Sequence, residues 1–405
     1  MYSITKTNSA DAGFCNHGPE SFKTTESGPL TGLSVGVKDL FAVEGYRNSA
    51  GNPDWYASHE PATQTATALN QLLHAGVEFK GFTLTDELAY SLEGNNHHYG
   101  KVMNPVVPGH ACGGSTMGSA AAVAGHWADI GLGTDTGGSI RIPASYCGLF
   151  GIRPSHGSVS IDGLIGLAPR FDTVGWLTRS SALLNRVGQL LLPACPSQPA
   201  SVLYVDKGLF NLVQTEFYSG LKEALIRLEA SFESVQTIDL GLDSQFKNLA
   251  DVFRILQGRS IAEYHGSWLK AKQPTLSTPV QARMEMALAI TDDEVRAAEA
   301  LRRTFCTHLE QTLPMDAVLF LPTTPTVAPK LGEDTGALRP RLMQLTSIAG
   351  LTGSAQVHLP LLPWQRADKT IMPYGFSFLQ RAGHDLSLLK TVESVVEAWN
   401  HEEFL

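Results

Sequence analysis

Short stretches of apolar residues with two different periods follow one another along the first half of the chain. At 33–37, just before Lys38, apolar residues alternate with small or polar ones, and this period of two predicts a strand. At 65–75 leucines recur at helical spacing and a glycine follows, which is typical of an amphipathic helix and its end. Further strands are predicted at 77–82 and 128–132, and a helix of small residues at 118–125.

The second half of the chain alternates in the same way. Strands are predicted at 202–205 and 317–321, and helices at 209–228, within 246–270, within 282–312, at 340–350 and at 386–400. Such alternation is typical of an α/β fold, in which helices cover both faces of a mostly parallel or mixed sheet. We see no linker or internal repeat, so we expect a single domain over 1–405, with two closely joined lobes as the alternative.

Two loops rich in glycine separate the predicted elements of the first half. One spans 94–118 and the other 133–138, and a Gly-Gly-Ser unit in each region places Ser115 and Ser139 24 residues apart. Consecutive glycines allow φ > 0 and a close approach of the backbone, which leaves N–H groups free to point at an anion. These loops are therefore the first place to look for chemistry.

The composition excludes several classes of protein. Hydrophobic residues make up 43% of the 405 residues, which is enough for a large core and argues against a disordered chain. The net charge is −9 with no basic run, so nucleic-acid binding is not expected. Because we find neither a secretory signal nor an apolar run of about 18 residues, we expect a soluble, cytoplasmic protein without a membrane partner.

The five cysteines do not indicate a metal site or a disulfide framework. No Cys-x-x-Cys or Cys-x-x-His spacing occurs, and their odd number favours reduced thiols. Cys112 lies near Ser115 but has no evident partner, so we interpret it as a small buried apolar residue. His97 and His98, with no neighbouring carboxylate or cysteine, make a weak metal site. We therefore predict no metal and no cofactor. The cysteines are Cys15, Cys112, Cys147, Cys195 and Cys306.

Three well-known motifs can be tested against the glycine-rich segments. Gly113 and Gly118 have the spacing of a phosphate-binding P-loop, but Ser119 stands where that motif needs lysine. The dinucleotide-binding motif is broken at Thr136. A G-x-S-x-G pattern occurs at 32–36, but its serine lies inside a predicted strand and not at a strand-to-helix turn. None of the three motifs is retained.

A longer set of motifs resembles the amidase signature family. It comprises Gly-Val-Lys-Asp at 36–39, Gly-Gly-Ser-Thr at 113–116, the stretch at 133–144, and the segments at 147–155, 171–175 and 321–325. The resemblance is dense over about 33–180, and segments at 52–55, 89–91 and 143–148 are most similar to short amidases related to plant indole-3-acetamide hydrolase. It implies an α/β amidase signature fold, with a central mixed, twisted sheet between two layers of helices and a C-terminal part that completes the sheet and the substrate cleft.

The resemblance implies catalytic roles for three residues that are far apart in the sequence. Ser139 is implied as the nucleophile, Ser115 as a bridging hydroxyl after a cis Gly114–Ser115 bond, and Lys38 as the base. A lysine accepts a proton only when neutral, and at an unperturbed pKa roughly one in 2,500 is neutral at pH 7. Burial lowers that pKa. The end of an apolar strand suits burial, and alternation along the strand would turn Asp39 to the other side.

The glycine-rich loop before Ser139 is implied to bind the substrate carbonyl. Glycines suit this role because a side chain would crowd the substrate. We expect Asp135 and Arg141 to brace the loop through hydrogen bonds. The family pattern has Ser, and Gly or Ser, where this chain has Thr116 and Met117, so Met117 is expected to add bulk beside the cleft. The backbone N–H groups implied as the oxyanion hole are those of Thr136, Gly137, Gly138 and Ser139.

The implied function is hydrolysis of a small, aryl or otherwise apolar carboxamide to a carboxylate and ammonia, through an acyl-enzyme. One alternative is a glutaminase-type subunit that supplies ammonia to a transamidating partner, although family members of that kind are longer. Another is a non-catalytic interaction protein on the amidase fold, as among chloroplast-envelope relatives, which would lack the catalytic serines. The expected partner is a small-molecule amide, and a homodimer stays open.

Overall fold

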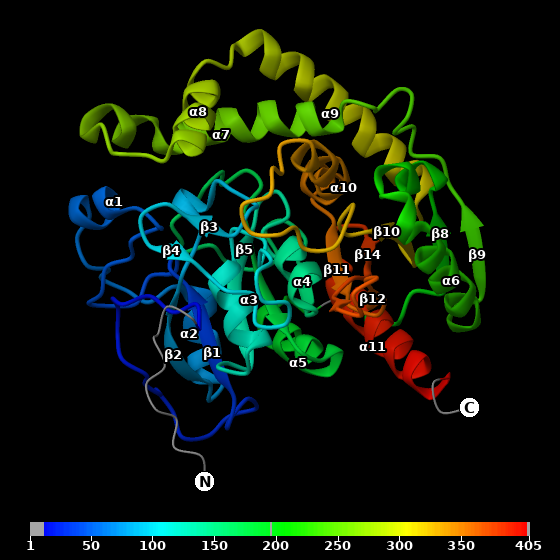
Figure 1. The fold of residues 1–405 in the computed structure, drawn as a ribbon, viewed down its shortest axis with the longest axis horizontal. Coiled ribbons are helices and arrows are strands. Elements are labelled where there is room, and N and C mark those ends of the chain that lie inside the picture. The colour runs from blue at the N-terminus through cyan, green and yellow to red at the C-terminus, as the bar shows by residue number, and fades with distance from the viewer. Residues whose placement is uncertain (1–11, 195–196, 403–405) are drawn as a thin grey trace.

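The computed structural model describes residues 12–194 and 197–402, and its central feature is a ten-stranded sheet. Strands from both halves of the chain join edge to edge in this sheet, which runs across the molecule (Figure 1). In spatial order the strands are β2 (Glu78–Thr83), β1 (Ser34–Lys38), β5 (Ile130–Asp135), β7 (Thr173–Thr178), β6 (Phe150–Arg153), β11 (Ala355–Leu359), β14 (Phe376–Gln380), β10 (Ala317–Pro322), β8 (Val202–Val205) and β9 (Ser234–Thr237).

The sheet is mixed, with parallel pairs toward its two ends and antiparallel pairs between them. β1 is parallel to β2 and β5, and β8 is parallel to β9 and β10. From β5 through β7, β6, β11 and β14 to β10, neighbouring strands are antiparallel. Two small hairpins lie outside the sheet, β3 (Asn95–Asn96) with β4 (Gly100–Lys101) and β12 (Trp364–Gln365) with β13 (Ile371–Met372).

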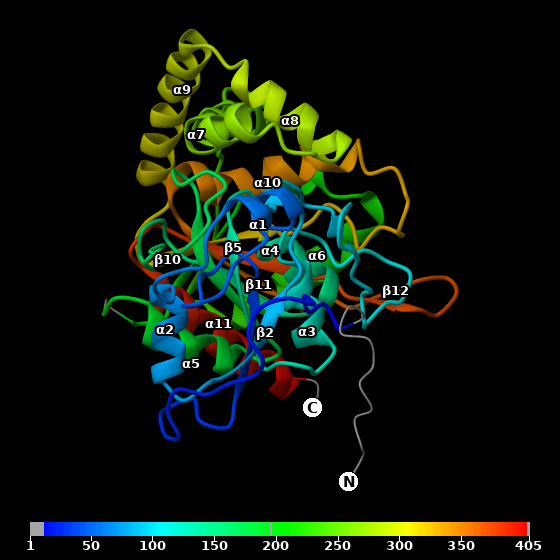
Figure 2. The same cartoon turned by 90° about the vertical axis from the view of Figure 1, so that its left-hand side faces the viewer.

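Helices cover both faces of the sheet, which confirms the predicted α/β class. α2, α5 and α11 pack on one face, whereas α3 and α4 lie on the other (Figure 2). A group made of α7, α8 and α9 packs together at one end of the molecule, above α10 (Figures 1 and 2). The helices are α1 (Pro53–Ser58), α2 (Thr67–His74), α3 (Met117–Ala124), α4 (Arg141–Cys147), α5 (Ser181–Leu191), α6 (Tyr218–Leu228), α7 (Leu249–Lys272), α8 (Thr278–Leu288), α9 (Asp292–Thr312), α10 (Leu338–Thr352) and α11 (Asp385–Glu402).

The residue types explain where these elements pack. β10 reads Ala-Val-Leu-Phe-Leu-Pro and is buried along its whole length, as expected for a strand covered on both faces. α3 consists of small residues because its backbone lies close to other backbone: a Cβ at Gly118 would come within 2.5 Å of the Leu84 nitrogen. This close packing holds the small-residue helix against the strands that carry the candidate site.

Most predicted elements are present, and two predicted helices differ in extent. The helix predicted at 209–228 is wrong in its first part, where two 3₁₀ turns, Lys207–Leu212 and Thr215–Phe217, precede α6. The segment 282–312 contains two helices, because the Thr291 side chain caps a new one, α9, together with Glu294. The predicted loop at 133–138 begins later than expected, since β5 continues to Asp135 by pairing with β7.

Several elements are not anticipated by the sequence pattern, among them α4, α5, β6, β7, β11 and β14. Among the described helices, none combines the length and apolar character that a membrane-spanning helix requires. Cys15, Cys112, Cys147 and Cys306 are free thiols, as predicted, and Cys195 lies outside the described residues. Cys112 is fully buried, which confirms its interpretation as a small core residue.

Candidate active site

Lys38 ends β1 in the interior of the protein and is completely buried. Its Nζ atom donates hydrogen bonds to three hydroxyl oxygens, at 2.7 Å to Ser115 Oγ, 2.9 Å to Thr134 Oγ1 and 3.1 Å to Thr116 Oγ1. Within the described part of the chain, no carboxylate forms an ion pair with this amine. The structure thus brings Lys38 and Ser115, two of the sequence-predicted site residues, into direct contact.

The buried position changes the proton affinity of Lys38. Burial lowers the pKa of Lys38 to about 7, against the opposing effect of the carboxylates of Asp86, Asp135 and Asp172. A pKa in this range leaves a large share of the amine neutral at pH 7. A neutral amine in hydrogen-bond contact with a serine hydroxyl can accept its proton, which is the property that a general base needs.

Ser115 follows a cis peptide bond with Gly114, as the resemblance implies. The Ser115 carbonyl accepts a hydrogen bond from Thr85 Oγ1 at 3.0 Å, and the residue is fully buried. Gly114 has no room for a side chain, because a Cβ there would lie 1.9 Å from Asp86 Oδ2 and 2.7 Å from the Gly94 nitrogen. The glycine before the serine is therefore required by its surroundings.

Ser139 lies between β5 and α4 and lines a small inner cavity. Among the described residues, no hydrogen bond joins its hydroxyl to Ser115 or to any other group. Catalytic hydrogen bonds are often long before substrate binds and tighten in the complex. Lys38 and Ser115 are therefore joined by a hydrogen bond, whereas Ser139 faces the cavity.

A buried ion cluster holds the loop that leads to Ser139. The Asp135 carboxylate pairs with Arg141 at 2.8 Å and with Arg153 at 3.1 Å, and all three side chains are fully buried. It also accepts hydrogen bonds from the N–H groups of Gly138 at 2.9 Å and Ile140 at 3.1 Å. Burial raises the pKa of Asp135, but the two arginines outweigh burial and hold the pKa well below its ordinary range. The bracing expected of Asp135 and Arg141 is thus present.

The donors on this loop differ in one respect from the expected oxyanion hole. The Gly138 N–H is already engaged by Asp135, so it is not a free donor. The loop is fixed further by a hydrogen bond from Thr136 Oγ1 to Asp172 at 2.6 Å and by one from Thr346 Oγ1 to the Gly137 carbonyl at 2.7 Å. Three N–H groups have no acceptor within the described residues, and they belong to Thr136, Gly137 and Ser139.

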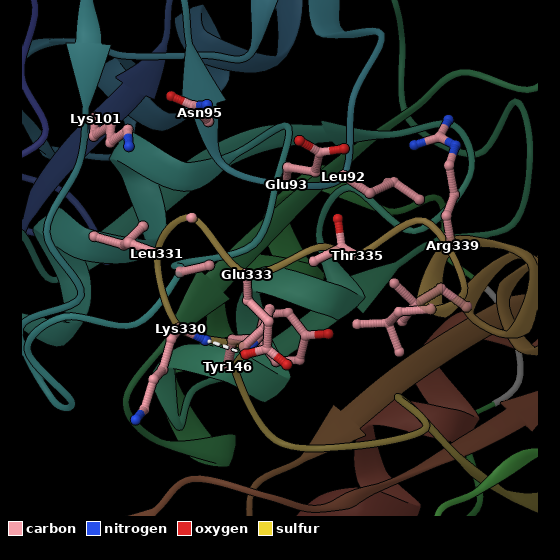
Figure 3. A pocket seen from close by; sticks show the side chains of 15 residues that line it. Leu92, Glu93, Asn95, Lys101, Tyr146, Lys330, Leu331, Glu333, Thr335 and Arg339 are labelled. Atoms are coloured by element: carbon pink, nitrogen blue, oxygen red, sulfur yellow. Dashed lines mark hydrogen bonds between the residues drawn. The ribbon is translucent and has the colours of Figure 1, made fainter. Parts of the chain in front are cut away.

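An outer pocket of about 720 Å³ adjoins the inner cavity. Leu92 and Arg339 line both spaces and therefore lie at their boundary. Figure 3 shows the outer pocket, with Arg339 and Leu92 on one side and Lys330 and Glu333 on another. The inner cavity has a mixed lining: the side chains of Tyr90, Leu92, Leu167 and Met343 are joined by the polar groups of Ser91, Gln257 and Arg339.

Other residues singled out in the sequence lie away from Ser139. His98 Nε2 donates to the Glu87 carboxylate at 2.6 Å, so the expectation that no carboxylate neighbours it is wrong. Met117 is fully buried in an apolar cluster and does not line the inner cavity, which corrects the expectation that it adds bulk beside the cleft. Ser34 begins β1 and donates to Asp129, so its G-x-S-x-G pattern is structural.

One group of metal-ligating side chains lies beside β1. Cys15, His17 and Asp39 bring a ligand atom each to within 4.8 Å of one another. The Asp39 carboxylate already accepts hydrogen bonds from His17, Asn48 and Ser49, so these donors account for its burial without a metal. The same bonds show that Asp39 faces away from the partners of Lys38, as strand alternation predicts.

Three residues of the site are not singled out by the sequence. Thr134 contacts Lys38, Arg153 pairs with Asp135, and Asp172 accepts from Thr136. All three lie inside the segments that carry the family resemblance, at 133–144, 147–155 and 171–175. Their position in these segments is the one feature of the sequence that could have identified them, because nothing in their local spacing indicates a buried polar contact.

Comparisons with known proteins agree with the motifs. The family profile described as Amidase matches residues 15–216. The chain is 35% identical to Amidase 1 of Arabidopsis thaliana over 92% of this chain and 95% of that relative. It is 32% identical to the Translocon at the outer membrane of chloroplasts 64 of Pisum sativum, over 91% of this chain and 66% of that relative. A crystal structure of an amidase superposes with a TM-score of 0.82 and 31% identity, covering 92% of this chain and 85% of the other. The chain therefore belongs to the amidase signature family.

Proposed function

We propose that the protein is an amidohydrolase that cleaves the C–N bond of a small linear carboxamide and releases a carboxylate and ammonia. The observation that carries the proposal is the buried Lys38 amine. It forms a hydrogen bond with Ser115 Oγ at 2.7 Å, and burial lowers its pKa to about 7. Membership in the amidase signature family supports amide hydrolysis. The side chains of Tyr90, Leu92, Leu167 and Met343 in the lining of the inner cavity support a substrate with an aryl or aliphatic body.

In the proposed reaction, Ser139 Oγ attacks the amide carbonyl carbon. Its proton passes to the Ser115 hydroxyl, which gives its own proton to neutral Lys38. The free N–H groups of the loop stabilise the charge on the carbonyl oxygen. The relay then protonates the amide nitrogen, the C–N bond breaks, and ammonia leaves an ester on Ser139. Water attacks this ester through the same relay, releases the carboxylate and restores Ser139.

The hydrogen bond between Lys38 and Ser115 favours an enzyme over a non-catalytic interaction protein. An unpaired lysine is costly to bury, and a protein that only docks partners has no evident use for one. A buried amine in contact with the Ser115 hydroxyl is expected where the amine has a chemical task.

Ammonia release from a panel of amides tests the proposal. The panel contains indole-3-acetamide, phenylacetamide, benzamide, short aliphatic amides and glutamine. We expect Ser139→Ala to abolish turnover of every active substrate, because no other group can form the ester. Lys38→Met should keep the circular dichroism spectrum and lower kcat by about 10²–10⁴-fold, the usual contribution of a general base.

Ser158→Ala is the matched control, since the Ser158 hydroxyl donates to the Ser155 carbonyl and lies outside the site. Full activity of Ser139→Ala would remove Ser139 from the nucleophile role. Turnover of glutamine alone would favour the glutaminase-type function.

A further inference from the structure

Arg339 lies in the first turn of α10, at the boundary between the inner cavity and the outer pocket. It shares the inner cavity with Ser139. In Figure 3 its side chain extends toward Leu92, away from Lys330 and Glu333. The guanidinium is thus a cationic group in the same small space in which the proposed nucleophile lies.

Among the residues that the structure describes, the guanidinium of Arg339 has no hydrogen-bond or ion-pair partner. Its Nη1 atom is buried and makes no hydrogen bond, and within residues 12–194 and 197–402 no carboxylate forms an ion pair with it. The two fully buried arginines of this region, Arg141 and Arg153, both pair with Asp135. Arg339 as a residue is half-buried, but a buried Nη1 without an acceptor is unfavourable, so such a group beside a cavity is expected where a ligand supplies the anion.

The surroundings of Arg339 do not neutralise it. Burial lowers the pKa of Arg339 to about 10, and the nearby charge of Arg283 adds to this effect. The carboxylates of Glu93 and Asp86 raise the pKa but do not cancel the decrease. Arg283 lies over the ring of Tyr90, with its guanidinium carbon 5.5 Å from the ring centre, and Tyr90 lines the inner cavity. Two guanidinium groups therefore act on this end of the cavity.

We propose, on the basis of the hydrolase function proposed above, that the substrates are amides that also carry a carboxylate. Arg339 binds this carboxylate while Ser139 attacks the amide at the other end of the molecule. A guanidinium matches a carboxylate with two parallel hydrogen bonds. The apolar side chains of the lining contact the body of the substrate, and the small size of the cavity favours a short body.

Matched pairs of substrates test this inference on the wild-type protein. Succinamate and butyramide differ by a carboxylate in place of a methyl group, and 4-carboxybenzamide and 4-methylbenzamide form an aryl pair. Hydrolysis of any of the four releases ammonia, so one assay measures them all. We expect kcat/KM to be about tenfold or more higher for the carboxylated member of at least one pair, mainly through KM, because an ion pair remote from the reacting carbonyl is made equally in the ground and transition states.

Variants then assign the preference to Arg339. Arg339→Met should bring the ratio of kcat/KM within the preferred pair close to one, and Arg339→Lys should keep part of it. Arg341→Met is the matched control on the same helix, since the Arg341 side chain donates to the Leu212 carbonyl and does not line the inner cavity. It should keep both the ratio and the activity.

The possible outcomes separate this inference from the proposed function. Hydrolysis of the neutral amides with no preference for either carboxylated one overturns the inference, as does a preference that Arg339→Met retains. Absence of turnover for every amide counts against the proposed function instead. In that case, calorimetric binding of succinamate that is lost in Arg339→Met supports the carboxylate site, and absence of binding to the wild type overturns it. If Arg339→Met fails to fold, the kcat/KM ratios of the wild type for the substrate pairs, and the same ratios for Arg339→Lys, still test the inference.

Discussion

The lowered pKa of Lys38 gives the proposed reaction a defined pH dependence. Only the neutral amine can accept the serine proton, so kcat/KM for a neutral amide should rise with pH and level off above the pKa of Lys38, which is about 7. At pH 6 we expect roughly a tenth of the plateau value. Initial rates of ammonia release from pH 5 to 9 measure this profile, and a flat profile would show that another group is the base.

A thermodynamic measurement gives an independent check of the same pKa. The pKa of Lys38 is lowered on folding, so between about pH 7 and 10.5 the unfolded chain binds the proton and the folded protein does not. The free energy of unfolding of the wild type, relative to Lys38→Met, should therefore increase with pH across this window. Urea unfolding at several pH values measures the difference. Parallel profiles for the two proteins would mean that the pKa is not lowered.

At the residue scale, the sequence predicted the pair of Lys38 and Ser115 but not their neighbours. The pair came from motifs that resemble a known family. The contact of Lys38 with Thr134 depends on the pairing of β1 with β5, in which Val37 lies opposite Leu132. Register between parallel strands is fixed by tertiary packing and not by residues near each other in the chain. Local patterns therefore could not identify Thr134.

At the scale of elements, the loop before α3 depends on the absence of a side chain at Gly114. A Cβ there would clash with the Asp86 carboxylate and the Gly94 backbone, so Gly114→Ala must displace the segment that carries Ser115. We expect a loss of about 2 kcal/mol or more in the free energy of unfolding and loss of most activity. Gly220→Ala is the control, because a Cβ at this position in α6 meets no atom within 4 Å. Equal stability of the two variants would contradict the prediction.

The differences between predicted and observed elements have local causes. The residues Thr-Asp-Asp-Glu at 291–294 form a capping box that begins α9, and the prediction of one helix within 282–312 did not take this box into account. No local motif indicates the 3₁₀ turns before α6. The chain there is held by a hydrogen bond from the Gln214 N–H to the carbonyl of Pro325, which is far away in the sequence. Secondary structure fixed by distant contacts is not readable from periodicity.

At the scale of the whole molecule, the second half of the chain completes a site whose motifs lie in the first half. Arg141 donates to Gln356 Oε1 at 2.6 Å and to the Thr346 carbonyl at 2.9 Å, which ties the loop before α4 to β11 and α10. Arg339 and Met343 on α10 line the inner cavity. The family resemblance is thin beyond about 180, so the sequence could place the proposed chemistry but not the wall that faces it.

This dependence on α10 leads to a prediction for Thr346. Its hydroxyl donates to the Gly137 carbonyl at 2.7 Å, and the side chain is fully buried. Thr346→Val keeps the shape but leaves that carbonyl without its donor, which should lower the free energy of unfolding by about 1–3 kcal/mol. Because the loop then loses a fixed position relative to the substrate, kcat should fall by about tenfold with a smaller change in KM.

Thr352→Val is the control for this prediction, since Thr352 lies at the end of the same helix and donates to the Ile348 carbonyl at 2.7 Å, away from the loop. It removes an equivalent hydroxyl and is expected to lower stability by a similar or smaller amount, but to leave kcat unchanged. Thermal unfolding and ammonia release, measured on both variants, separate the two effects. A similar fall of kcat in both variants would show that the loss of activity follows general destabilisation, and that α10 does not position the loop through Thr346.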